Sequence, residues 1–326
     1  MAETLYALVA MLADGRFHSG EDLGKSLGIG RAAVWKSLQQ LSPLGLELHA
    51  VSGRGYRLAT PVELLSESRI SVLLDDNCRN GLSGLQIFHS IDSTSKYLKQ
   101  AAESGAPSGT VCLAEHQSEG RGRRGRHWHS PYASNLYLSV VWRFNDGMSR
   151  LSGLSLAVAV AMMRCFDELG ASGTGIKWPN DIISEQGKLA GILLDVAGES
   201  SGPCYAVIGI GVNYDMSTTV GGVIDQAWTQ LRDCGVTLGR NEVVASLLNN
   251  LFKALMLYEQ EGFEAFRGEW QQWDMLRDHE VRLQMANETR DGIARGIDES
   301  GLLLVEQQGK LYHYAAGEVS LRKAGS

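Results

Sequence analysis

The chain has 326 residues, a formal net charge of −7 and 44% hydrophobic residues, which is typical of a globular protein with two or three domains and sizeable cores. Its five cysteines form no Cys-x-x-Cys pair and no even set. They therefore predict buried, reduced thiols and exclude a cysteine metal site or a secreted disulfide framework. No metal site is predicted elsewhere.

The sequence also argues against a membrane protein. The segment Met1-Ala2-Glu3-Thr4 lacks the basic region of a signal peptide, and the apolar stretch around Leu154 to Met163 is too short to span a bilayer. We therefore expect a cytoplasmic protein. Residues 1–60 carry six Lys/Arg and five Asp/Glu, whereas residues 61–326 carry 24 and 32. Only the N-terminal part is therefore a candidate for binding nucleic acid.

Residues 1–60 have the order of elements of a winged helix-turn-helix domain. Leucines and a valine at helical spacing predict a first helix over residues 5–12. Ser19 caps a second short helix, Gly28-Ile29-Gly30 makes a tight turn, and a third helix is predicted over Arg31–Leu41. Val51–Leu58 then predicts a hairpin tip with two arginines, like a wing.

The third helix is predicted to turn Ala32, Val34, Leu38 and Leu41 toward the core. Outward polar side chains would suit phosphates and base edges, and the predicted DNA contacts are Ser19, Arg31, Lys36, Ser37, Gln40 and Arg54. A three-helix protein-docking module is the alternative. Residues 61–68, with Pro61 at their start, are the predicted linker.

An arginine-glycine loop follows in the middle of the chain. Residues 120–129 read Gly-Arg-Gly-Arg-Arg-Gly-Arg-His-Trp-His. Glycines let backbone amides approach a phosphate, and guanidinium groups bind phosphate or carboxylate oxygens bidentately. The glycines fit the G-x-G-x-x-G dinucleotide motif, but Asn135–Trp142 predicts a strand where that motif needs a helix. An anion-binding loop is predicted; taken alone, it could also be a solvated basic loop or an RNA-binding segment.

Three further stretches share this polar theme. Asp92–Tyr97 puts hydroxyls at a strand-to-helix junction, where they can cap the helix or bind a polar ligand group. In Lys177–Asp181, Pro179 imposes a bend, which could be no more than a turn. Lys188 lies at the start of an apolar strand, where a cation is costly unless it meets an anion or reaches solvent.

In combination, these stretches resemble the family of bifunctional biotin protein ligases that also act as biotin operon repressors. The resemblance covers nearly the whole chain, including the N-terminal helix-turn-helix and residues 317–322. One departure is Ser95, where the family usually has Asn. The matching residues are Asp92-Ser93-Thr94, Gln117, residues 120–126, Trp128, Ser130-Pro131, Asn135-Leu136-Tyr137, residues 177–181, residues 187–193 and residues 209–213.

The resemblance implies an α+β fold in three parts. These are the winged helix-turn-helix over residues 1–60, a central mixed-sheet ligase domain like that of class II synthetases over residues 69–275, and a small SH3-like β-barrel over residues 276–326. Alternating patterns predict short strands at residues 281–284, 292–297, 301–305 and 310–314. A long amphipathic helix over residues 241–263 is predicted to serve core packing alone.

The activity that the resemblance implies has two steps and a regulatory arm. Biotin and ATP give biotinyl-5′-AMP and pyrophosphate, with Mg²⁺ bridging the phosphates, and biotin then passes to a lysine of the biotin carboxyl carrier protein of acetyl-CoA carboxylase. Biotinyl-AMP favours a homodimer that binds operator DNA and represses biotin synthesis genes. A lipoate or octanoyl protein ligase and a non-catalytic, ligand-sensing transcription factor are the alternatives.

The resemblance also implies roles for individual residues. Lys188, Arg121 and Arg123 are the expected catalytic residues, because cations must screen the repulsion between the biotin carboxylate and the α-phosphate. The glycines of the loop would let it open and then close over the acyl-adenylate. The expected biotin-binding residues are Ser93, Thr94, Ser95, Gln117, Gly120, Arg121, Gly122, Arg123, Trp128, Lys188 and Gly191. Those for ATP and the adenylate are Arg121, Arg123, Lys177, Asn180, Lys188, Asn213 and Trp228, the last in a second loop at residues 216–228.

Overall fold

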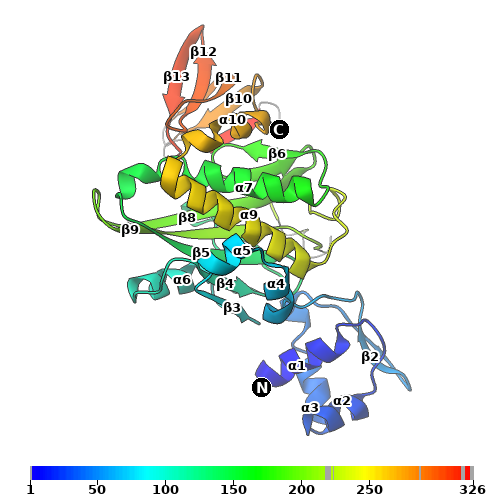
Figure 1. Ribbon diagram of the computed structural model, residues 1–326. Helices are drawn as coiled ribbons and strands as arrows, with labels where there is room; N and C mark the ends of the chain where they lie inside the picture. The colour runs from blue at the N-terminus through cyan, green and yellow to red at the C-terminus, as the bar shows by residue number, and fades with distance from the viewer. Residues whose placement is uncertain (1, 217–221, 223, 286–287, 317–319, 324–326) are drawn as a thin grey trace.

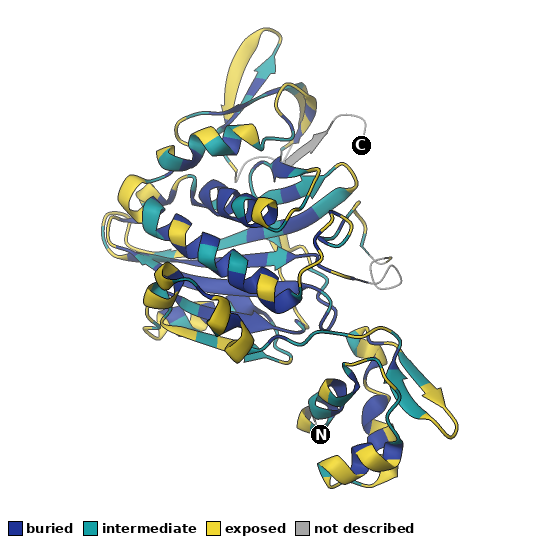
Figure 2. Ribbon diagram, turned by 45° about the vertical axis from the view of Figure 1, so that its right-hand side comes forward, coloured by how far each residue is buried: buried dark blue, intermediate teal, exposed yellow. Residues whose placement is uncertain are grey.

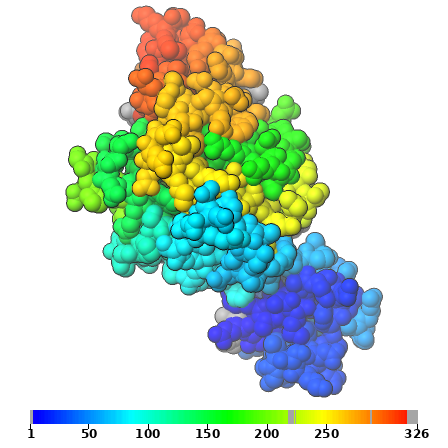
Figure 3. Space-filling model, viewed as in Figure 1, coloured from blue at the N-terminus to red at the C-terminus, as the bar shows by residue number. Residues whose placement is uncertain are grey.

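The computed structural model describes residues 2–216, 222, 224–285, 288–316 and 320–323. Three parts follow one another along the molecule: an N-terminal helical part, a central sheet with helices, and a C-terminal β part (Figure 1). In the space-filling view the N-terminal part forms a lobe of its own beside the larger body (Figure 3). The expected α+β architecture is confirmed.

The N-terminal part contains the elements that the sequence predicts. Ser19 caps the second helix by accepting a hydrogen bond from the backbone N–H of Asp22 at 3.0 Å. Gly28 ends that helix in the left-handed region, with φ at 65°. The third helix is shorter than predicted and ends at Leu38. The elements are α1 (Ala2–Leu12), α2 (Gly20–Leu27), α3 (Arg31–Leu38), η1 (Ser42–Leu44), β1 (Leu48–Val51) and β2 (Gly55–Leu58).

Two predicted orientations on α3 are wrong. Val34 and Leu38 are buried as expected, but Ala32 is exposed and Ser37 is buried, with only 8% of its surface exposed. Positions 34, 37, 38 and 41 share one face of an α-helix, so Ser37 lies on the core side and Ala32 lies opposite. Ser37 is therefore removed from the predicted DNA contacts.

The segment after the wing is tied to the neighbouring parts by backbone hydrogen bonds. The N–H of Val62 donates to the carbonyl of Ala13 at 3.0 Å, and the N–H of Leu65 donates to the carboxylate of Glu115 at 2.5 Å. Ser66 then caps α4 (Glu67–Leu73), which is followed by α5 (Asp76–Gly81).

A seven-stranded mixed sheet forms the centre of the molecule. Its strand order is β3-β4-β5-β9-β8-β7-β6, and β3 and β4 form its parallel pair; the other pairs are antiparallel. The strands are β3 (Gly84–Phe88), β4 (Thr110–Ala114), β5 (Leu136–Phe144), β6 (Thr174–Lys177), β7 (Asp181–Ser184), β8 (Gly187–Gly198) and β9 (Cys204–Val212).

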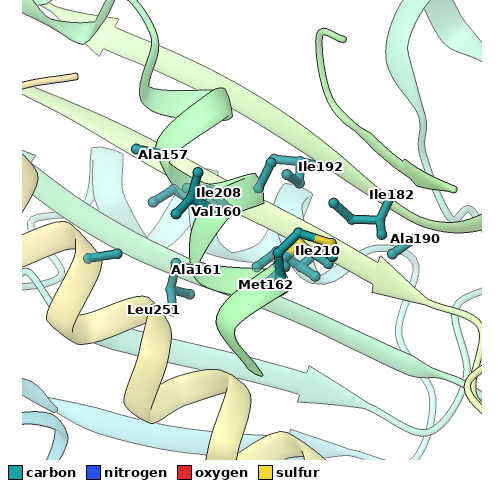
Figure 4. Packing of buried hydrophobic residues seen from close by; sticks show 14 of the residues in the cluster. Ala157, Val160, Ala161, Met162, Ile182, Ala190, Ile192, Ile208, Ile210 and Leu251 are labelled. Atoms are coloured by element: carbon teal, nitrogen blue, oxygen red, sulfur yellow. The ribbon is translucent and has the colours of Figure 1, made fainter. Parts of the chain in front are cut away.

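Helices α7 (Leu154–Glu168) and α9 (Arg240–Glu261) cover one face of this sheet (Figure 1). Apolar side chains of α7, such as Val160 and Met162, pack against those of β8 and β9 (Figure 4). The helix predicted over residues 241–263 is confirmed as core packing, because its apolar side is buried. Helix α6 (Thr94–Glu103) lies on the opposite face, with Leu98 against Val141 and Val207.

The C-terminal part is a five-stranded antiparallel sheet with the order β13-β12-β11-β10-β14. It follows α10 (Glu264–Gln272). Its first four strands correspond to the four predicted, whereas the fifth, Ser320–Lys323, was not predicted. Residues 317–319 of the matching C-terminal motif lie outside the described residues. The strands are β10 (Glu280–Gln284), β11 (Thr289–Ile297), β12 (Leu303–Gln307), β13 (Lys310–Tyr314) and β14 (Ser320–Lys323). Among the described residues, no helix combines the length and apolar character that crossing a membrane requires.

Candidate active site

The candidate site lies on the face of the central sheet opposite α7 and α9, beside the N-terminus of α6. Successive residues of a strand point to opposite faces. In β9, Ile208 and Ile210 are therefore buried toward α7 and α9, whereas Gly209 and Gly211 face the site. Ser139 of β5 pairs with Gly209 and points the same way. Because the residues of β9 that face the site are glycines, backbone without side chains forms the floor of the site.

Trp128 of the arginine-glycine loop lies on this floor. A Cβ added to Gly211 would lie 2.5 Å from Cε2 of the indole, and one added to Gly191 would lie 3.2 Å from Cζ3. Gly191 and Gly211 are direct partners across β8 and β9. Glycine at position 211 is therefore required for the indole to lie this close to the sheet, and a side chain at position 191 would crowd the indole. The expected grouping of Trp128 with Gly191 is present.

A chain of buried polar side chains runs from α6 to the arginine-glycine loop. The hydroxyl of Thr94 lies 2.8 Å from that of Ser139, and the N–H of Thr94 donates to Oε1 of Gln117 at 2.9 Å. The amide Nε2 of Gln117 donates to Oγ of Ser130 at 3.2 Å. Because a buried polar group needs a partner, such a chain can offer both donors and acceptors to a polar ligand. Sequence reasoning missed Ser139, the single polar residue between Leu136 and Trp142.

Ser93 and Ser95 have different surroundings. Ser93 is the N-cap of α6, with its hydroxyl accepting from the N–H of Lys96 at 3.5 Å, so the predicted cap is confirmed. Ser95 turns inward: its hydroxyl lies 3.0 Å from that of Ser139, and a Cβ on Gly209 would collide with it. The residue that replaces the usual Asn is thus part of the polar chain.

Lys188 reaches the same floor from the start of β8. Its Nζ lies 2.8 Å from Oδ1 of Asp181 and 5.3 Å from the centre of the Trp128 ring, and its side chain is 19% exposed. Its backbone N–H donates to Ala227, and its carbonyl accepts from the side-chain amide of Asn213 at 3.1 Å. A lysine this enclosed needs an anion, and in this structure Asp181 supplies it. Asp181 belongs to a predicted motif, but sequence reasoning gave it no role.

Arg123 and Lys188 contact neighbouring residues of the sheet, Arg123 binding Asn180 and Lys188 binding Asp181. Nη1 of Arg123 donates to Oδ1 of Asn180 at 2.9 Å, and its Nη2 donates to the backbone carbonyl of Ala316, after β13. Burial lowers the pKa of Arg123, Asp181 partly opposes that shift, and the neighbouring arginines add to it. Asn180 in turn donates to the carbonyl of Ile192 at 2.6 Å. Arg123 thereby connects the loop to the central sheet and to the C-terminal part.

The remaining predicted residues differ in exposure: Gly120 is buried, whereas Lys177 is half-buried. Arg121 is exposed, and its backbone pairs with that of His127. Lys177 pairs with Asp181 across β6 and β7, which puts the two side chains on the same face of the sheet. In the loop, a Cβ on Gly120 would collide with the carbonyl of Trp128. Gly122 donates to the carbonyl of Arg126 at 2.8 Å.

A small, open cavity lies beside Lys188. The side chain of Asn213 reaches it, as do those of two tryptophans, Trp128 and Trp228. Burial lowers the pKa of His129, which flanks Trp128; nearby His127 lowers it further, and Asp225 opposes the shift. Residues 217–221 and 223 of the predicted second loop lie outside the described residues. The cavity is lined by His127, Trp128, His129, Lys188, Asn213, Ile224, Gln226 and Trp228.

The site occupies the part of the chain that matches a known family. Residues 87–213 match the Biotin/lipoate A/B protein ligase family, residues 4–57 an HTH domain, and residues 278–322 the Biotin protein ligase C terminal domain. The chain is 42% identical over 317 residues to the bifunctional ligase/repressor BirA of Salmonella typhimurium, covering 97% of both chains. The chain belongs to the bifunctional ligase/repressor family.

Other members and structures agree with this assignment. The bifunctional ligase/repressor BirA of Escherichia coli is 40% identical over the same length, with 97% of both chains covered. The structure of biotin protein ligase from Aquifex aeolicus in complex with biotin and ATP superposes with a TM-score of 0.63 at 25% identity. It covers 74% of this chain and 100% of its own. The resemblance recognised in the sequence is confirmed.

Proposed function

We propose that this ligase/repressor joins biotin and ATP to give biotinyl-5′-AMP and pyrophosphate, and then transfers biotin to one lysine of the biotin carboxyl carrier protein of acetyl-CoA carboxylase. In the absence of acceptor, the adenylate-bound protein represses biotin synthesis genes. The observation that carries the proposal is the placement of Lys188 beside Gly191 and Trp128, with Arg123 held on Asn180 next to the Asp181 that binds Lys188. The buried polar chain lies on the same face of the sheet. Relatives that match over 97% of the chain carry both the ligase and the repressor description.

The floor and the polar chain suit the two halves of biotin. The ureido ring has N–H donors and a carbonyl acceptor, which match the hydroxyls of Thr94 and Ser95 and the amide of Gln117. We assign the apolar part of biotin to the floor that Gly191 and Gly211 leave open beside Trp128. Ser93, Gly120 and Gly122 shape the walls, Ser93 as a helix cap and the glycines by close backbone approach.

Lys188 is the proposed catalytic residue of the first step. A carboxylate oxygen of biotin attacks the α-phosphorus, the new C–O–P linkage forms, and the bond to the β-phosphate breaks as pyrophosphate leaves. Negative charge gathers on the α-phosphate oxygens, where a fixed ammonium is most effective. Asp181 holds the ammonium at 2.8 Å before the ligand arrives, so that little reorganisation is needed.

We assign the nucleotide to the cavity and its rim. Arg121 and Arg123 screen the phosphates, with Arg123 aimed by Asn180 at 2.9 Å. Trp228 is the proposed stacking partner for adenine, and Asn213 positions both Lys188 and the segment that carries Trp228. Lys177, opposite Asp181 in the sheet, adds a further cation on this face.

Mg²⁺ is expected to arrive with ATP. The described residues include no group of three or more His, Cys, Asp or Glu that could hold a metal ion. Mg²⁺ keeps several waters and commonly binds through substrate phosphates, so the side chains present fit an ion carried by the nucleotide. The five cysteines are all free and buried, and we propose the reducing cytoplasm as the location of the protein.

For repression, we propose that biotinyl-AMP favours a homodimer whose two winged helix domains bind the half-sites of an operator. Cations and polar groups at the start of α2, in and just after α3 and on the wing are the proposed DNA contacts; Ser19 is half-buried and the others are exposed. Transfer of biotin to the carrier consumes biotinyl-AMP. DNA binding would therefore occur when biotinyl-AMP accumulates because no carrier protein is available to accept the biotin. The proposed contact residues are Ser19, Arg31, Lys36, Gln40 and Arg54.

The decisive experiment is to incubate the purified protein with biotin, Mg²⁺ and labelled ATP, with and without a carrier domain. Biotin-dependent pyrophosphate release and transfer to one carrier lysine are the expected results. A preference for lipoate or octanoate in the same assay would favour lipoyl chemistry. The absence of any turnover in a folded protein would contradict the enzyme and leave a ligand-sensing regulator.

A further inference from the structure

The recognition helix α3 carries one large apolar side chain on its exposed surface. Trp35 is 46% exposed, whereas Val34 and Leu38 on the core side of α3 are at most 1% exposed. Beside Trp35 on the helix surface, three residues before it, is the small side chain of Ala32. Small residues allow a helix to approach a partner closely, and an exposed tryptophan on such a surface is unusual unless it has a function.

The indole is held in a fixed position by the wing. The ring of Trp35 stacks on that of Tyr56, with centroids 6.0 Å apart and planes inclined by 27°. Tyr56 is itself anchored, because its backbone exchanges hydrogen bonds with His18 at 2.8 and 2.9 Å. A Cβ on Gly20 would lie 2.9 Å from the Tyr56 ring, so α2 packs against the other side of this support. Trp35 therefore keeps one free side, and binding costs it little side-chain entropy.

Exposed cations lie on the same helix as Trp35 and on the wing. Arg31 and Lys36 are exposed on the same short helix. Arg54, at the tip of the exposed wing hairpin (Figure 2), is held over the ring of Phe17 at 4.1 Å. An apolar protein partner would have to cover these charges, at a desolvation cost. A DNA duplex satisfies both features, since its phosphates meet the cations while its base edges meet the ring of Trp35.

We infer that Trp35 is a sequence-reading residue that contacts the C5-methyl group of a thymine in the major groove. This inference rests on the proposed DNA-binding function. The thymine methyl is the apolar group that base pairs present in the major groove, where a recognition helix lies. Aromatic wedges between base pairs are a minor-groove device, and the Tyr56 ring already occupies one side of the indole. Trp35 is not among the DNA contacts predicted from the sequence, because those are all polar or charged residues.

The test uses the full-length protein with biotin and ATP. Binding sites are first selected from random duplex DNA, and each thymine of the selected site is then replaced by uracil, which lacks only the methyl group. Loss of one buried methyl is expected to weaken binding of the unaltered protein about fourfold at one position in each half-site. Trp35→Ala should bind about tenfold more weakly and be insensitive to uracil at that position. Trp35→Phe should keep part of the discrimination.

Two controls keep the outcomes distinct. Leu311→Ala removes an exposed apolar side chain of β13, 51% exposed, and should leave DNA binding unchanged. Unaltered ligase activity and thermal unfolding of Trp35→Ala show that the variant is folded. Equal uracil sensitivity in the Trp35→Ala and unaltered proteins, or no sensitive thymine at all, would overturn the inference while DNA binding itself stands. Failure of the unaltered, adenylate-bound protein to select any sequence would instead overturn the proposed repressor function.

Discussion

The ring of Tyr132 lies parallel to that of Tyr6, with centroids 5.9 Å apart and planes inclined by 7°. Tyr6 belongs to α1 of the N-terminal domain, whereas Tyr132 directly follows the arginine-glycine loop. Tyr132 also bonds to Nδ1 of His89 through its hydroxyl at 2.9 Å, and its N–H donates to the carbonyl of Leu44 at 2.9 Å. The segment that ends the arginine-glycine loop therefore packs in the hydrophobic core of the N-terminal domain.

Tyr132→Ala is therefore expected to destabilise the junction between these two parts. Tyr132 is fully buried, and removal of a large buried aromatic side chain costs about 3 kcal/mol or more in the free energy of unfolding. Tyr132→Phe keeps the ring stack but loses the hydrogen bond to His89, so the free energy of unfolding is expected to fall by about 1 kcal/mol. Urea unfolding at pH 7.5 measures both. Tyr312→Ala, which removes a 40% exposed ring, is the control; an equal loss there would contradict the proposed role of the junction.

Lys188→Met should lower the rate of biotin-dependent pyrophosphate release about 10²- to 10³-fold with little change in stability, because the ammonium is proposed to act mainly on the transition state. Asp181→Asn removes the partner at 2.8 Å and should lower kcat less, by about tenfold, since the ammonium remains but is no longer held. Single-turnover kinetics separate the two variants. Lys310→Met, on an exposed strand, is the matched control. Undiminished adenylation by Lys188→Met would remove Lys188 from the mechanism.

Gly211→Ala tests the floor of the site. The added methyl would lie 2.5 Å from the Trp128 ring, so the indole must shift away from the sheet. Overpacking of this kind costs about 1 to 3 kcal/mol, and the KM for biotin should rise about tenfold or more. Gly268→Ala is the matched control, because a methyl there meets nothing within 4 Å and the residue lies within α10. It should leave the KM unchanged and be neutral or slightly stabilising.

The sequence predicted the order of elements well because the strongest patterns are local. The cap at Ser19, the cap at Ser93 and the tight turn at Gly28 each depend on neighbours in the chain. Polarity alone wrongly predicts that Ser37 is exposed, because its spacing from Val34 and Leu38 puts it on the core side.

The features that the sequence did not reveal join distant segments. The buried ion pair of Arg240 with Glu115, at 2.6 Å, links residues 125 apart, and no local pattern selects the two partners. The same holds for the bond of Arg123 to Ala316 and for the contact of Tyr132 with α1. The residue types of the site could be predicted from motifs, whereas their supports follow only from tertiary packing.

Asp274 gives a stability change with pH that can be tested. It lies where α10 leads into β10, beside β6: the N–H of Met275 donates to Ile176, and that of Ile176 donates to Trp273. One carboxylate oxygen accepts from the N–H of Leu276 at 3.0 Å, whereas the other is buried without a hydrogen-bond partner in the described part of the chain. Burial raises the pKa of Asp274 to about 6 from its ordinary 3.8.

The folded state therefore holds this proton more tightly than the unfolded state, and stability falls as the pH rises from about 4 to about 6. Above this range, ionisation of the buried carboxyl lowers the free energy of unfolding by at most about 3 kcal/mol. Below this range the carboxyl is protonated and the loss vanishes. Asp274→Asn keeps the acceptor and removes the charge, so it should unfold at higher urea than the unaltered protein at pH 8 and lose that advantage at pH 4. Asp76→Asn, with a side chain 91% exposed, should show no such pH-dependent gain. A constant difference between the Asp274→Asn and unaltered proteins across pH 4 to 8 would contradict the raised pKa.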